Sequence, residues 1–158
     1  IRLKTDSPDV HANLGNALLD QGNVRDAIQH FEEALRLKPD ATIAINNLAW
    51  ALATHETSIP NGRERAIQLA EKACEQTGYK WPDAIDTLAA AYAAGQRFTE
   101  AVRTAQRAIE QASSAGDTGL AENIRGRLRL YEAGQPYRAA SRINPSDVGA
   151  RPPASAPR

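Results

Sequence analysis

The chain has 158 residues, of which 42% are hydrophobic, and its 19 basic and 19 acidic side chains give a formal net charge of zero. This composition fits one soluble domain and argues against a wholly disordered chain. The longest apolar run, residues 88–94, is far shorter than the roughly 20 residues that span a bilayer. The balanced charge also argues against a general nucleic-acid binder, whose affinity depends on surplus Lys and Arg.

Residues 1–7 contain the string IRLKTD, which superimposes on LRLKPD of residues 35–40 under a shift of 34 residues. We therefore expect residues 1–7 to be the end of a preceding, truncated repeat. The chain also lacks Met at position 1, so the sequence is interpreted as a fragment of a longer protein.

The first complete unit, residues 8–41, is predicted to form two helices. Its apolar and small residues recur at helical spacing: Leu14, Gly15, Leu18, Ala27, Phe31, Ala34 and Pro39. Gly22 separates the two helices, and Pro39 prevents the second from continuing. Asn23 is placed to cap the second helix, with Asp26 three residues later.

The same pattern returns twice. The second unit, residues 42–81, aligns with the first after a shift of 34 residues, but it carries an insertion at residues 54–63. This insertion is interpreted either as an inert bulge or as a second contact site. The third unit, residues 82–114, restores the spacing of the first. Fixed periods of this length are typical of solenoid proteins.

Beyond the repeats we expect one more helix and a tail. Within residues 115–137, an apolar stripe predicts a single amphipathic helix that caps the last repeat: Leu120, Ile124, Leu128 and Tyr131. Residues 138–158 hold four arginines against one aspartate, four prolines and no aromatic residue, so we expect a disordered tail. The predicted fold class is all-α.

These columns resemble the tetratricopeptide repeat family. The resemblance implies a right-handed helix-turn-helix solenoid of three units plus a C-terminal capping helix. The second and third units depart from it by having alanine in the columns of Gly15 and Phe31. The strings NNLAWALAT, TGYKWPDAIDTLAAAYA and LYEAGQPY are similar to a bacterial type of tetratricopeptide protein, for which the resemblance implies no known activity.

The sequence contains no recognisable catalytic or metal-binding motif. Phosphate loops, nucleophile elbows and paired-histidine helix motifs are all missing from it. His11, His30 and His55 fall in separate helices or loops, and Cys74 is the only cysteine. We therefore expect no enzymatic activity, no cofactor and no metal site. A lone cysteine is compatible with an intracellular, disulfide-independent setting.

The predicted binding surface is the concave groove lined by the first helix of each repeat. The residues expected to bind a peptide are Asn13, Asn16, Asn47, Trp50, Asp83 and Thr87. Asn13 and Asn47 occupy equivalent positions, and an amide donates and accepts hydrogen bonds, so a row of them can bind a peptide backbone. Thr87 stands in the third position. Alternatively, both amides bond neighbouring helix groups or water, and Trp50 either anchors a ligand or fills space in the core.

Family resemblance refines the expected ligand. The superhelix of O-linked N-acetylglucosamine transferase is similar in the column of Asn13 and Asn47, which implies a peptide-binding asparagine ladder at those two positions. A carboxylate clamp for acidic tails is also known in the family, but Ala12, Asp83 and Thr87 stand where its basic residues would be needed. We therefore expect a groove that accepts a neutral or basic peptide, because it carries the carboxylates of Asp9, Asp20, Asp83 and Asp86. Alternatively, these carboxylates belong to an ordinary solvated helix surface.

The sequence thus predicts a protein–protein interaction scaffold that binds an extended peptide segment, with no nucleic-acid or membrane partner. Two alternatives stay open. In one, the chain is the C-terminal repeat array of a longer enzyme, such as a glycosyltransferase, whose catalytic domain lies upstream. In the other, the truncated N-terminal face mediates self-assembly through Ala12 and neighbouring apolar groups.

Overall fold

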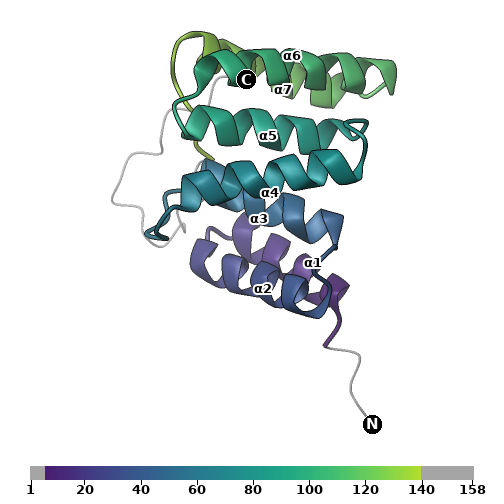
Figure 1. Cartoon of the computed structure of the whole chain (residues 1–158), viewed down its shortest axis with the longest axis vertical. Coiled ribbons are helices and arrows are strands. Elements are labelled where there is room, and N and C mark those ends of the chain that lie inside the picture. Colours follow the sequence, from purple (N-terminus) through teal and green to yellow (C-terminus); the bar gives the residue numbers. More distant parts are fainter. Residues whose placement is uncertain (1–5, 140–158) are drawn as a thin grey trace.

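The computed structural model describes residues 6–139, and residues 1–5 and 140–158 lie outside this range. Helices follow one another in antiparallel pairs that stack into a solenoid, from the first pair at the bottom of Figure 1 to the last at the top. They are α1 (Pro8–Asp20), α2 (Val24–Leu37), α3 (Thr42–Thr54), α4 (Gly62–Gln76), α5 (Pro82–Ala94), α6 (Phe98–Ser114) and α7 (Thr118–Glu132). The predicted all-α class is confirmed.

The predicted insertion, the capping helix and the two ends of the chain can be located relative to these helices. The loop between α3 and α4, residues 55–61, lies within the predicted insertion of residues 54–63, whose ends belong to the two helices. Helix α7 stands where a helix was expected after the last repeat. Most of the predicted N-terminal repeat remnant and of the predicted tail lies outside the described range. No helix within residues 6–139 is long and apolar enough to cross a membrane.

Two of the helical hairpins, α1–α2 and α5–α6, close with the same backbone turn. After α1, the Asn23 N–H donates to the Leu18 carbonyl at 2.8 Å, and Gly22 adopts φ 79° in between. After α5, the Arg97 N–H donates to the Tyr92 carbonyl at the same distance. This six-residue closure satisfies a helix-end carbonyl and reverses the chain. The side chain of Asn23 makes no capping bond within the described part of the chain, so its predicted side-chain cap is wrong.

The core between the stacked helices is built largely of alanine. Ala49, Ala70, Ala89 and Ala105, which stand in the Gly15 and Phe31 columns of the later units, are all fully buried. Small side chains allow helix backbones to approach closely while the interior keeps its usual packing density. The later units therefore pack as tight alanine layers.

The first pair fills the same space with a different combination. Phe31 is fully buried on α2, and a Cβ atom added at Gly15 would lie 2.5 Å from Cε1 of that ring. Glycine in α1 therefore makes room for the aromatic ring of α2. In the second and third units, an alanine stands in each of the two columns, so two small side chains replace the glycine and the aromatic ring.

This complementarity predicts a strongly coupled pair of substitutions. Gly15→Ala alone should destabilise the fold by about 1–3 kcal/mol, because the added methyl group overpacks against the ring. In a Phe31→Ala background, Gly15→Ala should instead be neutral or stabilising by up to about 1 kcal/mol, since alanine has the better helix propensity. Urea unfolding of the four proteins in the cycle measures the coupling, and additive effects would contradict it.

Equivalent leucines of the first two units are not equally buried. Leu48 is 0% exposed, whereas Leu14 is 43% exposed, although the sequence pattern predicted the same packing face for both. The reason is position, because α1 is the first described helix and no preceding pair covers it. Ala12, predicted to contribute to self-assembly, is instead buried against alanines of α2 and α3, and the exposed apolar neighbour of Leu14 is Val10.

We therefore expect the two leucines to respond differently to truncation. Leu48→Ala should lower the free energy of unfolding by about 2–5 kcal/mol, because it removes contacts and leaves a cavity. Leu14→Ala should change it by less than about 1 kcal/mol, as is usual at exposed positions. Parallel denaturant titrations provide the measurement, and equal losses would show that Leu14 is covered in solution.

Candidate functional site

A shallow hollow of about 270 Å³ lies where the first helices of the second and third pairs meet α7. We refer to it as the α3–α5–α7 hollow. Its lining residues are Asn46, Asn47, Trp50, Asp83, Asp86, Thr87, Leu120 and Arg127. Four of them were predicted from the sequence, so the fold brings most of the expected binding residues together.

The two remaining predicted residues lie apart from this hollow. Asn13 and Asn16 are exposed on α1 and do not line it. Asn13 nevertheless stands one repeat before Asn47 in the same column. The predicted ladder therefore has one freely exposed amide on α1 and one partly buried amide on α3.

The hollow contains two amide atoms that make no hydrogen bond to any residue in the described range. They are Oδ1 of Asn46, whose residue is only 7% exposed, and Nδ2 of Asn47. Burying such an atom without a partner costs about 1–3 kcal/mol. One atom is a hydrogen-bond acceptor and the other a donor. Asn46 was not among the residues predicted to bind a peptide, and Ala12 stands in its column in the first unit.

A buried ion pair forms the wall of the hollow opposite these amides. Arg127 donates from Nε to Asp86 Oδ1 at 3.1 Å and from Nη2 to Oδ2 at 2.6 Å, and the two side chains are only 13% and 6% exposed. Burial raises the pKa of Asp86, and the charge and hydrogen bonds of Arg127 partly offset that rise. This two-point contact connects α5 to α7.

The interpretation of Asp86 as a solvated surface carboxylate is therefore wrong. Its partner could have been suspected from the sequence, because Arg127 lies three residues after Ile124 and four before Tyr131. That spacing places a charged side chain on the apolar stripe of the capping helix. A charge in such a position requires a buried counter-charge.

Trp50 lies at the junction of the hollow and the core. Its ring packs against the core and is tilted 38° to the Tyr137 ring, with centroids 5.8 Å apart. The Arg127 guanidinium lies 5.5 Å from the Trp50 centroid and 5.4 Å from that of Tyr137, within the range of cation–π attraction. The Trp50 side chain therefore both packs against the core and lines the hollow. Tyr137 was not expected to take part, since it lies beyond the helical pattern.

Thr87 and Asp83 take different positions from those of the asparagines. Thr87 is 2% exposed, and its hydroxyl donates to the Asp83 carbonyl at 2.9 Å. Its hydroxyl is therefore occupied within α5. The Asp83 side chain is exposed at the rim, where it supplies the unpaired negative charge of the hollow because Asp86 is neutralised by Arg127.

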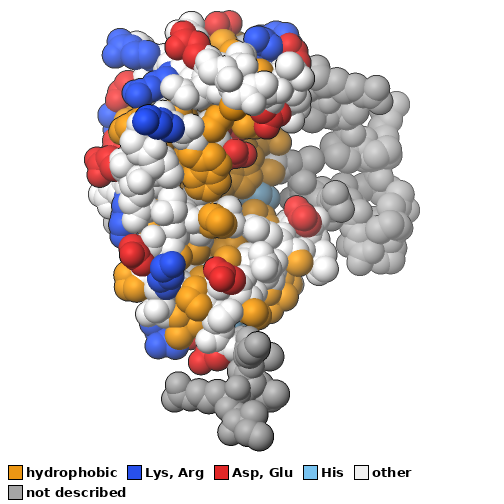
Figure 2. Space-filling model, turned by 90° about the vertical axis from the view of Figure 1, so that its right-hand side faces the viewer, with side chains coloured by type: hydrophobic (Ala, Val, Ile, Leu, Met, Phe, Trp, Pro, Cys, Tyr) orange, Lys and Arg blue, Asp and Glu red, His pale blue; other side chains and the backbone are white. Residues whose placement is uncertain are grey.

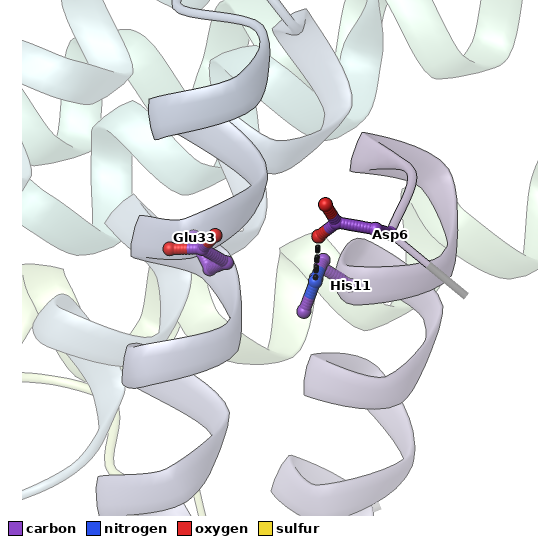
Figure 3. Close-up of side chains that lie close together, drawn as sticks. All are labelled: Asp6, His11 and Glu33. Atoms are coloured by element: carbon purple, nitrogen blue, oxygen red, sulfur yellow. Dashed lines mark ion pairs between the residues drawn. The ribbon is translucent and has the colours of Figure 1, made fainter. Parts of the chain in front are cut away.

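A second polar cluster joins α1 to α2. Asp6, His11 and Glu33 each have a potential metal-ligand atom, a carboxylate oxygen or a ring nitrogen, and these atoms all lie within 4.8 Å of one another. Figure 3 shows the ion pair between Asp6 and His11, whose atoms are 3.6 Å apart. His11 also stacks on His30, with ring nitrogens 3.0 Å apart, although the sequence placed them in separate elements. The Arg36 Nε–H is shared between both carboxylate oxygens of Glu33, at 3.0 and 2.9 Å, and Nη2 donates to Oε1 at 2.5 Å. These hydrogen bonds lower the pKa of Glu33. We assign this cluster to holding the first helical pair together.

The single cysteine does not offer a reactive thiol. Cys74 is fully buried in the core, and burial raises the pKa of its thiol to about 12. A protonated thiol is a poor nucleophile at neutral pH.

The outer surface shows no large patch of one charge in the view of Figure 2. Hydrophobic side chains gather along the middle of that side, and acidic and basic side chains are interspersed around them. This distribution agrees with the zero net charge of the chain. Long-range attraction of a highly charged partner is therefore not favoured on that side.

Breaking the ion pair of the hollow should destabilise the protein in a pH-dependent way. Arg127→Leu should cost about 3–5 kcal/mol at pH 7, because it leaves the Asp86 carboxylate buried without its counter-charge. The pKa of Asp86 should then rise further, so the folded state takes up a proton as the pH falls. The loss should therefore be smaller at pH 4 than at pH 7.

Urea titrations at both pH values test this expectation. The control is the double variant Asp86→Leu/Arg127→Leu, which should lose much less stability than either single change. A loss of the same size at both pH values would show that Asp86 is not the buried, uncompensated charge.

Comparisons with known proteins agree with this architecture. Residues 8–41 match the family model described as the tetratricopeptide repeat, with the bounds predicted for the first unit. A curated relative, the DnaJ homolog subfamily C member 7 homolog of Schizosaccharomyces pombe, is 31% identical over 118 residues, which make up 75% of this chain. The chain spans only 24% of that relative's length.

A solved structure shows the same fold. The crystal structure of the Sgt2 TPR domain from Aspergillus fumigatus superposes with a TM-score of 0.58, covering 89% of this chain and 92% of that chain at 21% identity. The comparisons support the tetratricopeptide repeat family that the sequence columns resemble.

Proposed function

We propose that this chain is a protein–protein interaction scaffold that binds an extended peptide segment on its concave face, with the α3–α5–α7 hollow as the central contact. The observation that carries the proposal is the pair of buried, unpaired amide atoms of Asn46 and Asn47. An extended peptide supplies what both atoms lack, because its backbone presents N–H and C=O groups in alternation.

In this arrangement the asparagines read the peptide backbone. Asn47 Nδ2 donates to a peptide carbonyl, and Asn46 Oδ1 accepts from a peptide N–H. Asn13 extends the row by one repeat, in the manner of the asparagine ladder of O-linked N-acetylglucosamine transferase. Contacts of this kind favour an extended conformation over a particular sequence.

The charges of the hollow favour a neutral or basic segment. Asp83 is exposed at the rim, and both hydrogen bonds of Arg127 go to Asp86. An acidic C-terminal tail would therefore meet an unpaired carboxylate and no available cation. The partner class that fits is an internal or basic peptide rather than one that ends in an acidic motif.

The amide pair should decide affinity. In a peptide-array screen followed by titration of the peptides that bind, Asn47→Ala should weaken binding about tenfold or more, because a peptide carbonyl loses a buried donor. Asn13→Ala should weaken it less, since that amide is exposed. The matched control is Gln68→Ala, an exposed amide on α4 outside the hollow, which should leave affinity unchanged.

The double variant Asn13→Ala/Asn47→Ala must still unfold cooperatively for this comparison to hold. If that folded double variant binds the selected peptides as tightly as the unchanged protein, the asparagine ladder is refuted. If the unchanged protein binds no peptide on the array, peptide binding by this face is refuted as well.

A further inference from the structure

The chain's own segment after α7 lies against the C-terminal end of α3. Gly134 adopts φ 70°, and the Gln135 N–H donates to the Leu130 carbonyl at 2.9 Å, which ends α7 with the same closure as the hairpin turns. No further helix follows in the described range. Instead the chain returns toward α3, as the yellow-green segment of Figure 1 shows.

Three consecutive residues of this returning segment each make a different contact. The Tyr137 ring packs on Trp50 beside the Arg127 guanidinium. Arg138 donates from Nη1 to the Ala53 carbonyl at 3.4 Å, and the Ala139 N–H donates to the Thr54 carbonyl at 2.9 Å. The segment thus offers an aromatic ring, a cation and a backbone donor in order.

These contacts suit the end of a helix. The last carbonyls of α3 have no partner within the helix, and the C-terminal end of a helix carries partial negative charge. A guanidinium and a backbone N–H are the groups that such an end attracts. Recognition here therefore depends on helix geometry, together with the one aromatic side chain of Trp50.

The α3–α4 loop, which contains the insertion of the second unit, lies beside the contact between the returning segment and α3. A hollow of about 430 Å³ is lined by residues of the α3–α4 loop and start of α4 together with Arg138, among them His55, Glu56 and Arg63. A neighbouring hollow of about 290 Å³ includes Ala139. The loop that interrupts the repeat spacing therefore borders the segment, which a hairpin turn as short as that of the first unit would not do.

We propose that Trp50 and the C-terminal end of α3 form a docking subsite for an extended segment in which an aromatic residue is followed by a basic one. The chain's own Tyr137–Arg138–Ala139 segment fills it in cis, and a partner segment of the same chemistry displaces it. The proposal rests on the proposed function, because Trp50 also lines the α3–α5–α7 hollow, so a peptide lying there extends toward the Tyr137 position.

The contacts of the segment are consistent with exchange. Residues 136–139 are all only partly buried, and a single short hydrogen bond, from Ala139, joins the segment to α3. A tethered occupant nevertheless competes strongly, because its effective concentration is high. The apparent affinity of a free peptide is then reduced by the fraction of molecules whose subsite is already filled.

The test uses the indole of Trp50 as the reporter. Trp81→Phe leaves Trp50 as the single tryptophan, because the chain has only two. Into this background we would titrate a synthetic peptide with the sequence GQPYRAA and follow the Trp50 emission. The Tyr137→Ala variant should bind this peptide at least tenfold more tightly than the Trp81→Phe parent, because the internal competitor is weakened.

Two control peptides and two control variants give the experiment its specificity. The peptide GQPARAA lacks the aromatic ring, and GQPYEAA has a negative charge in place of the positive one. Each should bind the Tyr137→Ala variant at least tenfold more weakly than GQPYRAA does. Tyr137→Phe keeps the ring and should behave as the parent does. Arg138→Ala removes the hydrogen bond to the Ala53 carbonyl, so it should also weaken the internal competitor and tighten peptide binding. This variant replaces Tyr137→Ala in the test if Tyr137→Ala does not fold.

Equal binding of GQPYRAA to the parent and to folded Tyr137→Ala would overturn the proposal, because no competition would exist. Trp50 emission that responds to no peptide in either folded variant would also overturn it and make the segment a fixed part of the fold. Peptides selected on the array separate the two proposals. If they still bind in an Asn47-dependent way while these titrations fail, only the subsite proposal is refuted.

Discussion

Close helix packing through small side chains is the constraint on which the rest of this structure depends. Helices of adjacent pairs meet through layers of fully buried alanine, and in the first pair through a glycine placed beside the Phe31 ring. Small residues at these contacts let the helix backbones approach one another. Because each layer also has little side-chain volume to adjust, the stacking of one pair on the next is closely determined.

This packing brings polar side chains from three helices together. Where α3, α5 and α7 meet, the helices carry an amide pair, a carboxylate and an arginine instead of apolar groups. Arg127 satisfies Asp86, and the two charges connect the capping helix to the third repeat. The buried amide atoms of Asn46 and Asn47 have no such partner in the described range, and for this reason we propose them as the peptide contacts.

The sequence predicted four of the eight residues that line the candidate site, and the failures have a common cause. Asn47, Trp50, Asp83 and Thr87 were found because equivalent columns of a repeat face the same way. Asp86 was misread as a surface residue because its partner lies 41 residues later, in a helix outside the repeat pattern. Tyr137 was missed for a related reason, since nothing in its local sequence indicates that the chain returns to α3.

By itself, the sequence determined the helical pairs, the repeat period, the place of the insertion and four of the residues that line the α3–α5–α7 hollow. These properties depend on local spacing, because helix periodicity and turn residues act over a few positions. Only the tertiary structure decided that Leu14 is exposed where Leu48 is buried, that Asp86 is paired and that Tyr137 packs on Trp50. Those outcomes depend on which distant segments cover a side chain, and local spacing does not identify those segments.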